Sequence, residues 1–244
     1  TGWDMSGITL DETGANQSTN AAMLHGVEQM TGKVMIFTEG GFTMIKPLQA
    51  REVNYPGIAP FIGNVFGHPE ALTFPKYFTG LRESINLAHG GDANSKLLKL
   101  VMGSVNLRIL SKKKASNLLS WLENMQNMKV ERIDDNKPPI MYGLAKGFKN
   151  GAPEIVGVCL KMDNPQTAST VQELGMGHVT GIPLTCGVKL LAERTITRTG
   201  VLAPEAGHID PRMFIEDVFA ELSKAIHKPL GGFEDTVTIS RSWE

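Results

Sequence analysis

The part of this chain that most restricts its fold is residues 180–205, with the sequence TGIPLTCGVKLLAERTITRTGVLAPE. Thr180 is a helix-capping residue, and Pro183 is tolerated in a first helical turn because its missing N–H has no partner to lose there. Gly200 favours a helix end, and Pro204 soon after it forbids a continuation. The stretch therefore predicts a helix that begins at Thr180 and ends before Gly200.

Two features of this predicted helix bear on its role. Leu184, Val188 and Leu191 are spaced four and three residues apart, which places them on one apolar face. A helix that begins at Thr180-Gly181 would point free backbone N–H groups at the space before it, where a carboxylate or a phosphate could bind. The alternative is a capped core helix without a ligand.

Composition and charge exclude several classes of protein. The 244 residues are 41% apolar and 20% charged, as in ordinary globular proteins, and the net charge of −1 gives no overall attraction to nucleic acid or to an anionic membrane. No apolar run approaches the roughly 20 residues that span a bilayer, and no signal peptide is visible. Cys159 and Cys186, the only cysteines, have no metal-binding spacing. We therefore expect a cytoplasmic protein with reduced thiols and with neither a nucleic-acid nor a membrane partner.

The clearest β pattern lies in Ile140–Met162. Apolar residues alternate or run together on either side of Asn150-Gly151, a pair that favours the type I′ turn of a hairpin. Shorter strands are expected at Lys33–Glu39, an apolar run between glycines, and at Thr236–Trp243, which alternates. These segments predict a largely antiparallel sheet.

Helical periodicity accounts for most of the remaining chain. Helices are expected at 13–30, 92–103, 114–128 and 167–177, and again from Pro211 onward, whereas Phe42–Gly80 is interpreted as a long ordered loop. We therefore expect one domain, residues 1–244, of the α/β (α+β) class. It would consist of a mixed, largely antiparallel sheet covered by helices, with a small helical insertion at about 92–128.

A few residues outside this helix, and one inside it, could contribute to a binding or catalytic site. Gly40 and Gly41 directly follow a predicted strand, where glycines let a ligand approach the backbone closely; a plain tight turn is the alternative. Arg82 is a natural bidentate partner for a carboxylate, although an arginine near the start of a helix, as is expected here, is more often only solvated. His178 could act as a general acid or base, or could cap the same loop. Cys186 could have a lowered thiol pKa near a helix start, or be structural.

Several motifs with well-understood chemistry are absent from the sequence. There is no G-x-G-x-x-G dinucleotide fingerprint and no P-loop. The H-E-x-x-H motif, paired-cysteine zinc patterns and the G-x-S-x-G elbow do not occur either. We therefore expect no metal site and no complete dinucleotide-binding site in this chain.

The order of motifs from residue 180 onward resembles the C-terminal region of the saccharopine dehydrogenase (saccharopine reductase) family. That region has a Thr-Gly-x-Pro helix, a glycine step, a Gly-Val-x-x-Pro-Glu segment and a closing helix. The matching residues here are Thr180, Gly181, Pro183, Gly200, Val201, Pro204 and Glu205, followed by the segment IDPRMFIEDVFAEL. The resemblance is closest over Met141–Leu222 and looser before Met141.

The resemblance also implies roles for earlier residues. The N-terminal GWDMSGI is similar to a family turn that approaches the nicotinamide, which would make Asp4 and Gly7 cofactor-binding residues. In the family a strand followed by Gly-Gly lines the substrate cleft, as Gly40 and Gly41 would here, although Glu39 stands where several members have cysteine. Family members begin with a Rossmann domain. A chain that starts at a threonine without one is expected to be the C-terminal part of such an enzyme.

The implied function is NAD- or NADP-dependent oxidoreduction at the C–N bond of an amino-acid conjugate, as in lysine metabolism. The small-molecule amino-acid substrate would be held by Gly40, Gly41, Arg82, Thr180 and Gly181, and two copies would pair through the sheet as a homodimer. The chain alone would be inactive, since the cofactor half would be missing. Two alternatives stay open: a non-catalytic dimerisation or scaffold module, and a family relative that acts on a carboxy-polyamine or a lipid.

Overall fold

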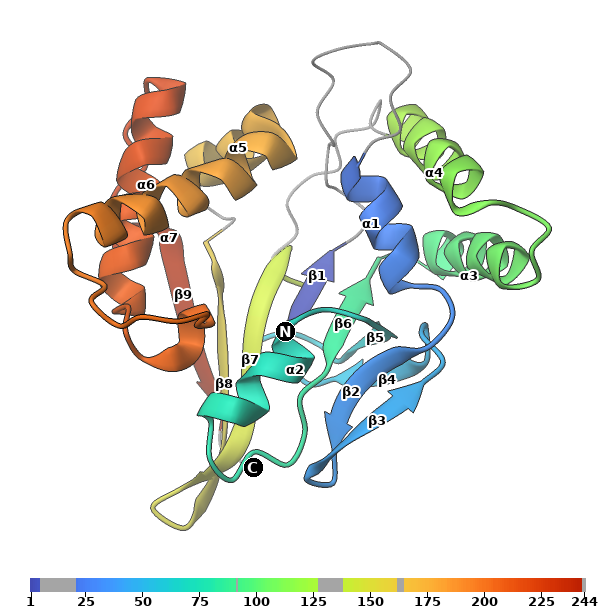
Figure 1. The fold of residues 1–244 in the computed structure, drawn as a ribbon, viewed down its shortest axis with the longest axis horizontal. Coiled ribbons are helices and arrows are strands. Elements are labelled where there is room, and N and C mark those ends of the chain that lie inside the picture. The colour runs from blue at the N-terminus through green and yellow to red at the C-terminus, as the bar shows by residue number, and fades with distance from the viewer. Residues whose placement is uncertain (5–20, 91, 127–137, 162–164, 243–244) are drawn as a thin grey trace.

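The computed structural model describes residues 1–4, 21–90, 92–126, 138–161 and 165–242 (Figure 1). The strands are β1 (Gly2–Asp4), β2 (Val34–Thr38), β3 (Gly41–Ile45), β4 (Ala50–Val53), β5 (Phe61–Phe66), β6 (Asn86–His89), β7 (Met141–Lys149), β8 (Ala152–Leu160) and β9 (Val237–Ser242). The helices are α1 (Ala21–Gln29), α2 (Glu70–Tyr77), α3 (Asp92–Asn106), α4 (Lys112–Gln126), α5 (Pro165–Ala192), α6 (Pro211–Ile226) and α7 (Phe233–Thr236), with a 3-10 turn, η1, at Pro204–Ala206.

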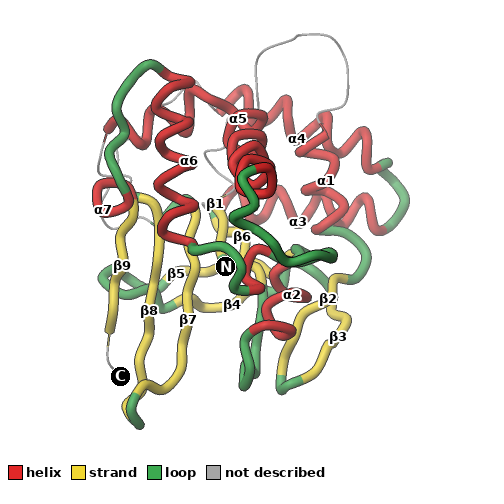
Figure 2. Tube along the Cα trace, turned by 60° about the vertical axis from the view of Figure 1, so that its left-hand side comes forward, coloured by secondary structure: helices red, strands yellow, loops and turns green. Residues whose placement is uncertain are grey.

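The large sheet has the order β4-β5-β6-β1-β7-β8-β9, and β2 and β3 form a separate hairpin. Every neighbouring pair in the large sheet is antiparallel except β1 and β6, which run parallel. In Figure 2 most of the helices form a layer above the strands, and α2 lies near the β2–β3 hairpin. The expected class, a mixed and largely antiparallel sheet covered by helices, is confirmed.

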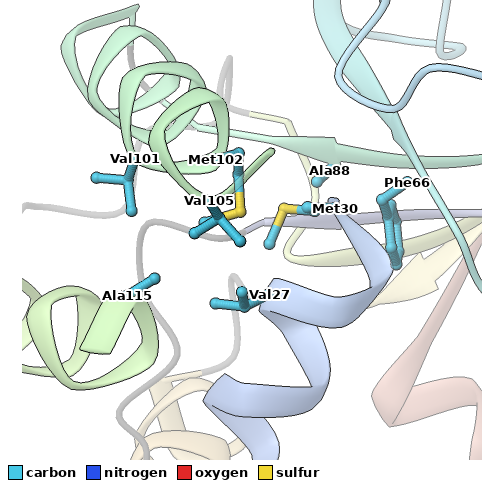
Figure 3. Close-up of a cluster of buried hydrophobic side chains, with 8 residues drawn as sticks. All are labelled: Val27, Met30, Phe66, Ala88, Val101, Met102, Val105 and Ala115. Atoms are coloured by element: carbon cyan, nitrogen blue, oxygen red, sulfur yellow. The ribbon is translucent and has the colours of Figure 1, made fainter. Parts of the chain in front are cut away.

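One hydrophobic cluster joins the helices α1, α3 and α4 to the sheet (Figure 3). Its buried members are Val27, Met30, Phe66, Ala88, Val101, Met102, Val105 and Ala115. The α1 and α3 members recur at helical spacing, so each helix presents one apolar face to the others. The expected helices at 92–103 and 114–128 are therefore an α-hairpin that packs on the same core as the sheet.

Two further clusters complete the core. The first lies against the other face of the large sheet and consists of Val34, Ile36, Val53, Tyr55, Val65, Leu87 and Tyr142. The second lies between α6 and neighbouring segments and is built on Phe219, Leu222 and Leu230, with Leu160 and Ile182 packed against it. The sheet is thus buried on both faces around its centre.

The β2–β3 and β7–β8 hairpins both have two-residue turns in which φ is positive. Asn150 and Gly151 have φ values of 54° and 82°, which confirms the type I′ turn expected between β7 and β8. Glu39 and Gly40 have φ values of 52° and 79° between β2 and β3. Gly40 therefore lies in a plain tight turn, which was the alternative to a ligand-binding role. Gly41 is the first residue of β3.

The expected long loop over Phe42–Gly80 is wrong. That region contains β4, β5 and α2 as well as most of β3. Its strands are only four to six residues long and lie between prolines and glycines, so they show no sustained local period. They form because they pair with other strands: β3 with β2, β4 with β5, and β5 with β6.

The helix expected to begin at Thr180 begins at Pro165 and runs without a break to Ala192. Pro183 therefore lies in the interior of α5, where it removes one backbone hydrogen bond. Backbone N–H groups inside a helix donate to carbonyls four residues earlier. Thr180 is not a cap, and the free N–H donors proposed there for an anion do not exist.

The apolar stripe of α5 is on its outer side. Leu184, Val188 and Leu191 are exposed, with 69%, 56% and 55% of their surface accessible. Cys186 and Leu190 are buried instead. The helix therefore packs through the face that carries Cys186 and Leu190. No described residue covers the opposite, apolar face.

The closing helix and strand agree with the sequence. Asp210 caps α6, since its side chain accepts a hydrogen bond of 2.8 Å from the backbone N of Met213, and Pro211 occupies the first turn. β9 covers most of the strand expected at Thr236–Trp243. Within the described residues, none of the helices combines the length and the apolar character needed to cross a membrane.

Candidate functional site

The carboxyl ends of β1 and β6 meet in the middle of the large sheet. The strands run parallel, and their register pairs Asp4, the last residue of β1, with His89, the last residue of β6. Ligands of open α/β sheets bind outside the carboxyl ends of parallel strands. This end of the β1–β6 pair is therefore where the fold most favours a ligand.

His89 is held firmly at this position. Only 4% of its surface is exposed. Its imidazole centroid lies 5.2 Å from the ring of Phe61 and 5.8 Å from the ring of Tyr142. Histidine is the side chain whose ordinary pKa allows proton exchange near neutral pH, and a packed ring keeps its nitrogens in one direction. His89 is the candidate acid or base of this site.

Two tyrosines lie beside it. The Tyr142 hydroxyl is buried and has no hydrogen-bond partner among the described residues, and burial raises the pKa of Tyr142 well above its usual value. The Tyr55 ring lies 5.6 Å from that of Tyr142. Burial, followed by the nearby Cys159 thiol, raises the pKa of Tyr55. Both hydroxyls therefore keep their protons at neutral pH and can act as hydrogen-bond donors.

Two glycines make room for these rings. The ring of Tyr142 covers Gly2 on the neighbouring strand, and the ring of Tyr55 covers Gly157. A methyl group on Gly157 would lie 2.5 Å from two ring carbons of Tyr55. The two tyrosine rings can lie directly over the neighbouring strands only because Gly2 and Gly157 have no side chain.

A second titratable pair lies near the other end of β6. His68 and Glu70 form an ion pair at the start of α2. Burial, the largest single influence, would raise the pKa of Glu70. The hydrogen bond from His68, a backbone hydrogen bond and the nearby positive charges together outweigh it, so the pKa of Glu70 is below its usual value. The side-chain amide of Asn86 donates to the His68 carbonyl oxygen at 3.1 Å, and the Trp3 ring meets the imidazole edge to face at 5.7 Å. Both side chains are partly exposed.

The structure brings Gly40 and Arg82 together through the backbone. The Gly40 N–H donates to the Arg82 carbonyl oxygen at 3.2 Å, beside two reciprocal bonds between Phe37 and Ser84. The Gly40 amide is therefore already used inside the protein. Arg82 lies in the loop between α2 and β6, not at a helix start, and its side chain is exposed. This loop precedes β6, so Arg82 and His89 lie at opposite ends of that strand.

The candidates on α5 lie elsewhere. His178, Thr180 and Gly181 are within this helix, and Figure 1 places α5 away from the β2–β3 hairpin that carries Gly40. His178 and Thr180 are exposed. Cys186 is buried in mid-helix, and burial followed by the carboxylates of Glu221 and Asp217 raises the pKa of its thiol. A lowered pKa at a helix start is therefore wrong for Cys186.

Of the two expected cofactor-binding residues, Asp4 ends β1, whereas Gly7 lies outside the described residues. Sequence reasoning missed His89, Tyr142 and the His68–Glu70 pair. The sequence does contain a signal for His89: it ends a short segment directly before a Gly-Gly pair, as Glu39 does before Gly40-Gly41. The pairing of β1 with β6, which places His89 beside Asp4, has no local signal.

In the part of the chain that the structure describes, no three His, Cys, Asp or Glu side chains are grouped as a metal site would require. The chain matches no protein-family model and none of the curated proteins.

Proposed function

We propose that this chain is the substrate-binding and dimerising part of an NAD(P)-dependent oxidoreductase similar to saccharopine dehydrogenase, acting at the C–N bond of an amino-acid conjugate. The observation that supports this most is the place of Asp4. The first residues of the segment GWDMSGI, which resembles the family turn near the nicotinamide, form β1, and Asp4 is the carboxyl-terminal residue of this central strand, which runs parallel to β6. A ligand is expected at that end of such a strand.

Within this proposal His89 exchanges a proton with the substrate amine. Its imidazole lies at the end of β6 in register with Asp4, and the packing against Phe61 and Tyr142 fixes its orientation. An amine nitrogen must gain or lose a proton when its C–N bond is made or broken, and imidazole is suited to that transfer near neutral pH. Tyr142 would donate a hydrogen bond to the same substrate.

The described residues do not fit a whole dinucleotide. The chain has no glycine-rich phosphate-binding turn, and the β1 end offers one strand terminus rather than a phosphate cradle. The proposal therefore assigns the adenosine and pyrophosphate of NAD or NADP to residues outside this chain. A cytoplasmic location belongs to the same proposal and agrees with the two cysteines, which are not joined in a disulfide.

We expect Arg82→Ala in the full gene product to raise KM for a dicarboxylate conjugate about tenfold, with kcat unchanged. The guanidinium would bind the far carboxylate of an extended substrate, and a charge-assisted hydrogen bond contributes about 1.5 kcal/mol or more. The measurement is steady-state oxidation of NADH or NADPH with amino acids paired with aldehydes or keto acids. Lys76→Ala, an exposed cation on α2, is the matched control and should leave KM unchanged. An unchanged KM in Arg82→Ala removes Arg82 from the site.

The homodimer of the proposal is supported by the uncovered face of α5. Leu184, Val188 and Leu191 form an exposed apolar strip of the kind that marks protein contacts. We expect Val188→Glu to weaken self-association about a hundredfold in sedimentation equilibrium, since burying an unpaired charge costs about 3 kcal/mol. Ile239→Glu on the edge strand β9 is the comparison, because Ile239 is similarly exposed and the resemblance implies pairing through the sheet instead. Dissociation by Ile239→Glu alone would place the contact at the sheet edge.

The same face supports a second candidate function, a non-catalytic dimerisation module. Two results together would favour this candidate over the oxidoreductase. The protein would form a dimer that depends on Val188, and the gene product would oxidise neither NADH nor NADPH with any pair of amine and carbonyl substrates.

A further inference from the structure

The charges of this chain are unevenly distributed. Residues 93–122 include six of the 24 lysines and arginines and none of the 25 acidic residues, which leaves a charge of −7 on the rest of the chain. The six are Lys96, Lys99, Arg108, Lys112, Lys113 and Lys114, and all have exposed side chains. The overall charge of −1 therefore conceals a basic α3–α4 hairpin, whose only acidic residues are Asp92 at its start and Glu123 near its end.

The turn of this hairpin, residues 107–114, is hydrogen-bonded to the end of α3 and displays apolar side chains. Arg108 adopts φ 60° and its N–H bonds to Val105 O at 2.9 Å, while Ile109 N–H bonds to Ser104 O at 3.0 Å, as in a Schellman motif. Leu110 packs against the core between the two helices. The hydroxyl of Ser111 then caps α4 by accepting from Lys114 N at 3.3 Å.

On either side of the inward-facing Leu110, the neighbouring apolar residues point outward. Leu107 and Ile109 are 73% and 76% exposed. The apolar residue after a Schellman end usually packs back on its own helix, but Ile109 does not. On α4, Lys114, Leu118 and Trp121 follow at intervals of four and three residues and are all exposed, so one helix face combines a cation, an aliphatic group and an indole.

The lysines of this turn are also poorly placed for the stability of α4. Lys112, Lys113 and Lys114 occupy its first turn, where the positive end of the helix dipole disfavours cations. Only Lys112 has an acidic partner, Glu28, at 3.5 Å among the ion pairs of the described residues. An external anionic surface would relieve this repulsion.

We propose that the α3–α4 turn, residues 107–114, is a docking site for an anionic lipid bilayer. Such a surface has two layers, charged headgroups outside and acyl chains beneath. The basic side chains match the headgroups, and the exposed aliphatic groups and the tryptophan match the acyl chains. Leu107 and Ile109 would enter the interface, and Arg108, Lys113 and Lys114 would contact the headgroups. A nucleic acid would use the cations but not aliphatic groups at the tip, since bases stack on aromatic rings. The proposal is independent of the oxidoreductase function.

The test is co-sedimentation of the 244-residue protein with vesicles of phosphatidylcholine alone and of equal parts phosphatidylcholine and phosphatidylserine. Binding is expected only to the anionic vesicles, and it should decrease as salt is added because charges at a surface are screened. The Trp121 emission should shift to shorter wavelength on binding, and Trp121→Phe should remove most of the shift. Failure to bind the anionic vesicles overturns the proposal.

Two double variants locate the site. Lys113→Glu with Lys114→Glu, and Leu107→Ser with Ile109→Ser, should each weaken binding at least tenfold without lowering the melting temperature, since these side chains are exposed. The β7–β8 hairpin tip offers a matched control, an exposed Phe148 between Lys146 and Lys149. Lys146→Glu with Lys149→Glu, and Phe148→Ser, should leave binding intact. Equal losses from the control variants overturn the proposal, as does tight binding of RNA that persists in the Leu107→Ser, Ile109→Ser protein.

Discussion

Gly157→Ala is expected to destabilise this protein by about 3 kcal/mol, at the upper end of what overpacking of a core costs. The added methyl group would lie 2.5 Å from the Cε2 and Cζ atoms of Tyr55 and 2.9 Å from its hydroxyl oxygen. Gly157 is paired with Leu144 of β7 on one side and Ser240 of β9 on the other, so its backbone cannot withdraw without disturbing two ladders. Tyr55 is itself buried and has little room to move.

Thermal unfolding would measure this effect as a fall in Tm of roughly 6–12 °C, given about 2–4 °C per kcal/mol for a chain of this size. Gly147→Ala on β7 is the matched control, because nothing lies within 4 Å of a methyl group there. Tyr55→Leu should recover part of the loss when combined with Gly157→Ala, since the two changes share one contact. Equal melting temperatures for the Gly157→Ala and Gly147→Ala proteins would show that Tyr55 does not hold this position.

His89→Gln is expected to reduce kcat of the full gene product by a factor of about 10²–10⁴, the usual contribution of a positioned acid or base. Glutamine is close to histidine in size and retains hydrogen-bonding groups, but it cannot carry a proton between the substrate and water. The loss should be in kcat rather than KM if His89 acts on the reacting nitrogen.

The pH dependence of kcat separates this role from a structural one. The wild-type profile should contain a limb that follows the protonation of His89, and that limb should be absent in His89→Gln. His68→Gln is the comparison, because His68 lies near the other end of β6 and should leave the limb in place. A His89→Gln enzyme with the wild-type kcat and profile would exclude His89 as the acid or base.

Helix α5 illustrates why sequence periodicity could predict a helix but not its orientation. The residues Leu184, Val188 and Leu191 have helical spacing, and so do Ile182, Cys186 and Leu190. Either set could be the buried one from local spacing alone. The choice is made by α6 and the cluster around Phe219 and Leu222, which lie later in the chain and are met only in three dimensions.

The candidate site shows the same limit more strongly. The hairpin at Asn150-Gly151 and the cap at Asp210 are encoded within a few residues and could be predicted. The neighbourhood of His89 depends on Phe61, Tyr142 and the register with Asp4, each from a different part of the sequence. Parallel pairing has no turn signal, because the two strands are joined by a long crossover.

The central place of β1 has a consequence for the order in which this protein folds. Strands β4, β5 and β6 are close in sequence, and each pairs antiparallel with the next. Strands β7 and β8 form a hairpin. These two units can therefore form early, because closing short loops costs little entropy. Neither unit pairs with the other: the three residues of β1 bridge them, pairing with Leu87–His89 on one side and Met141–Tyr142 on the other. The continuous sheet, and with it the neighbourhood of His89, is completed only when this strand inserts.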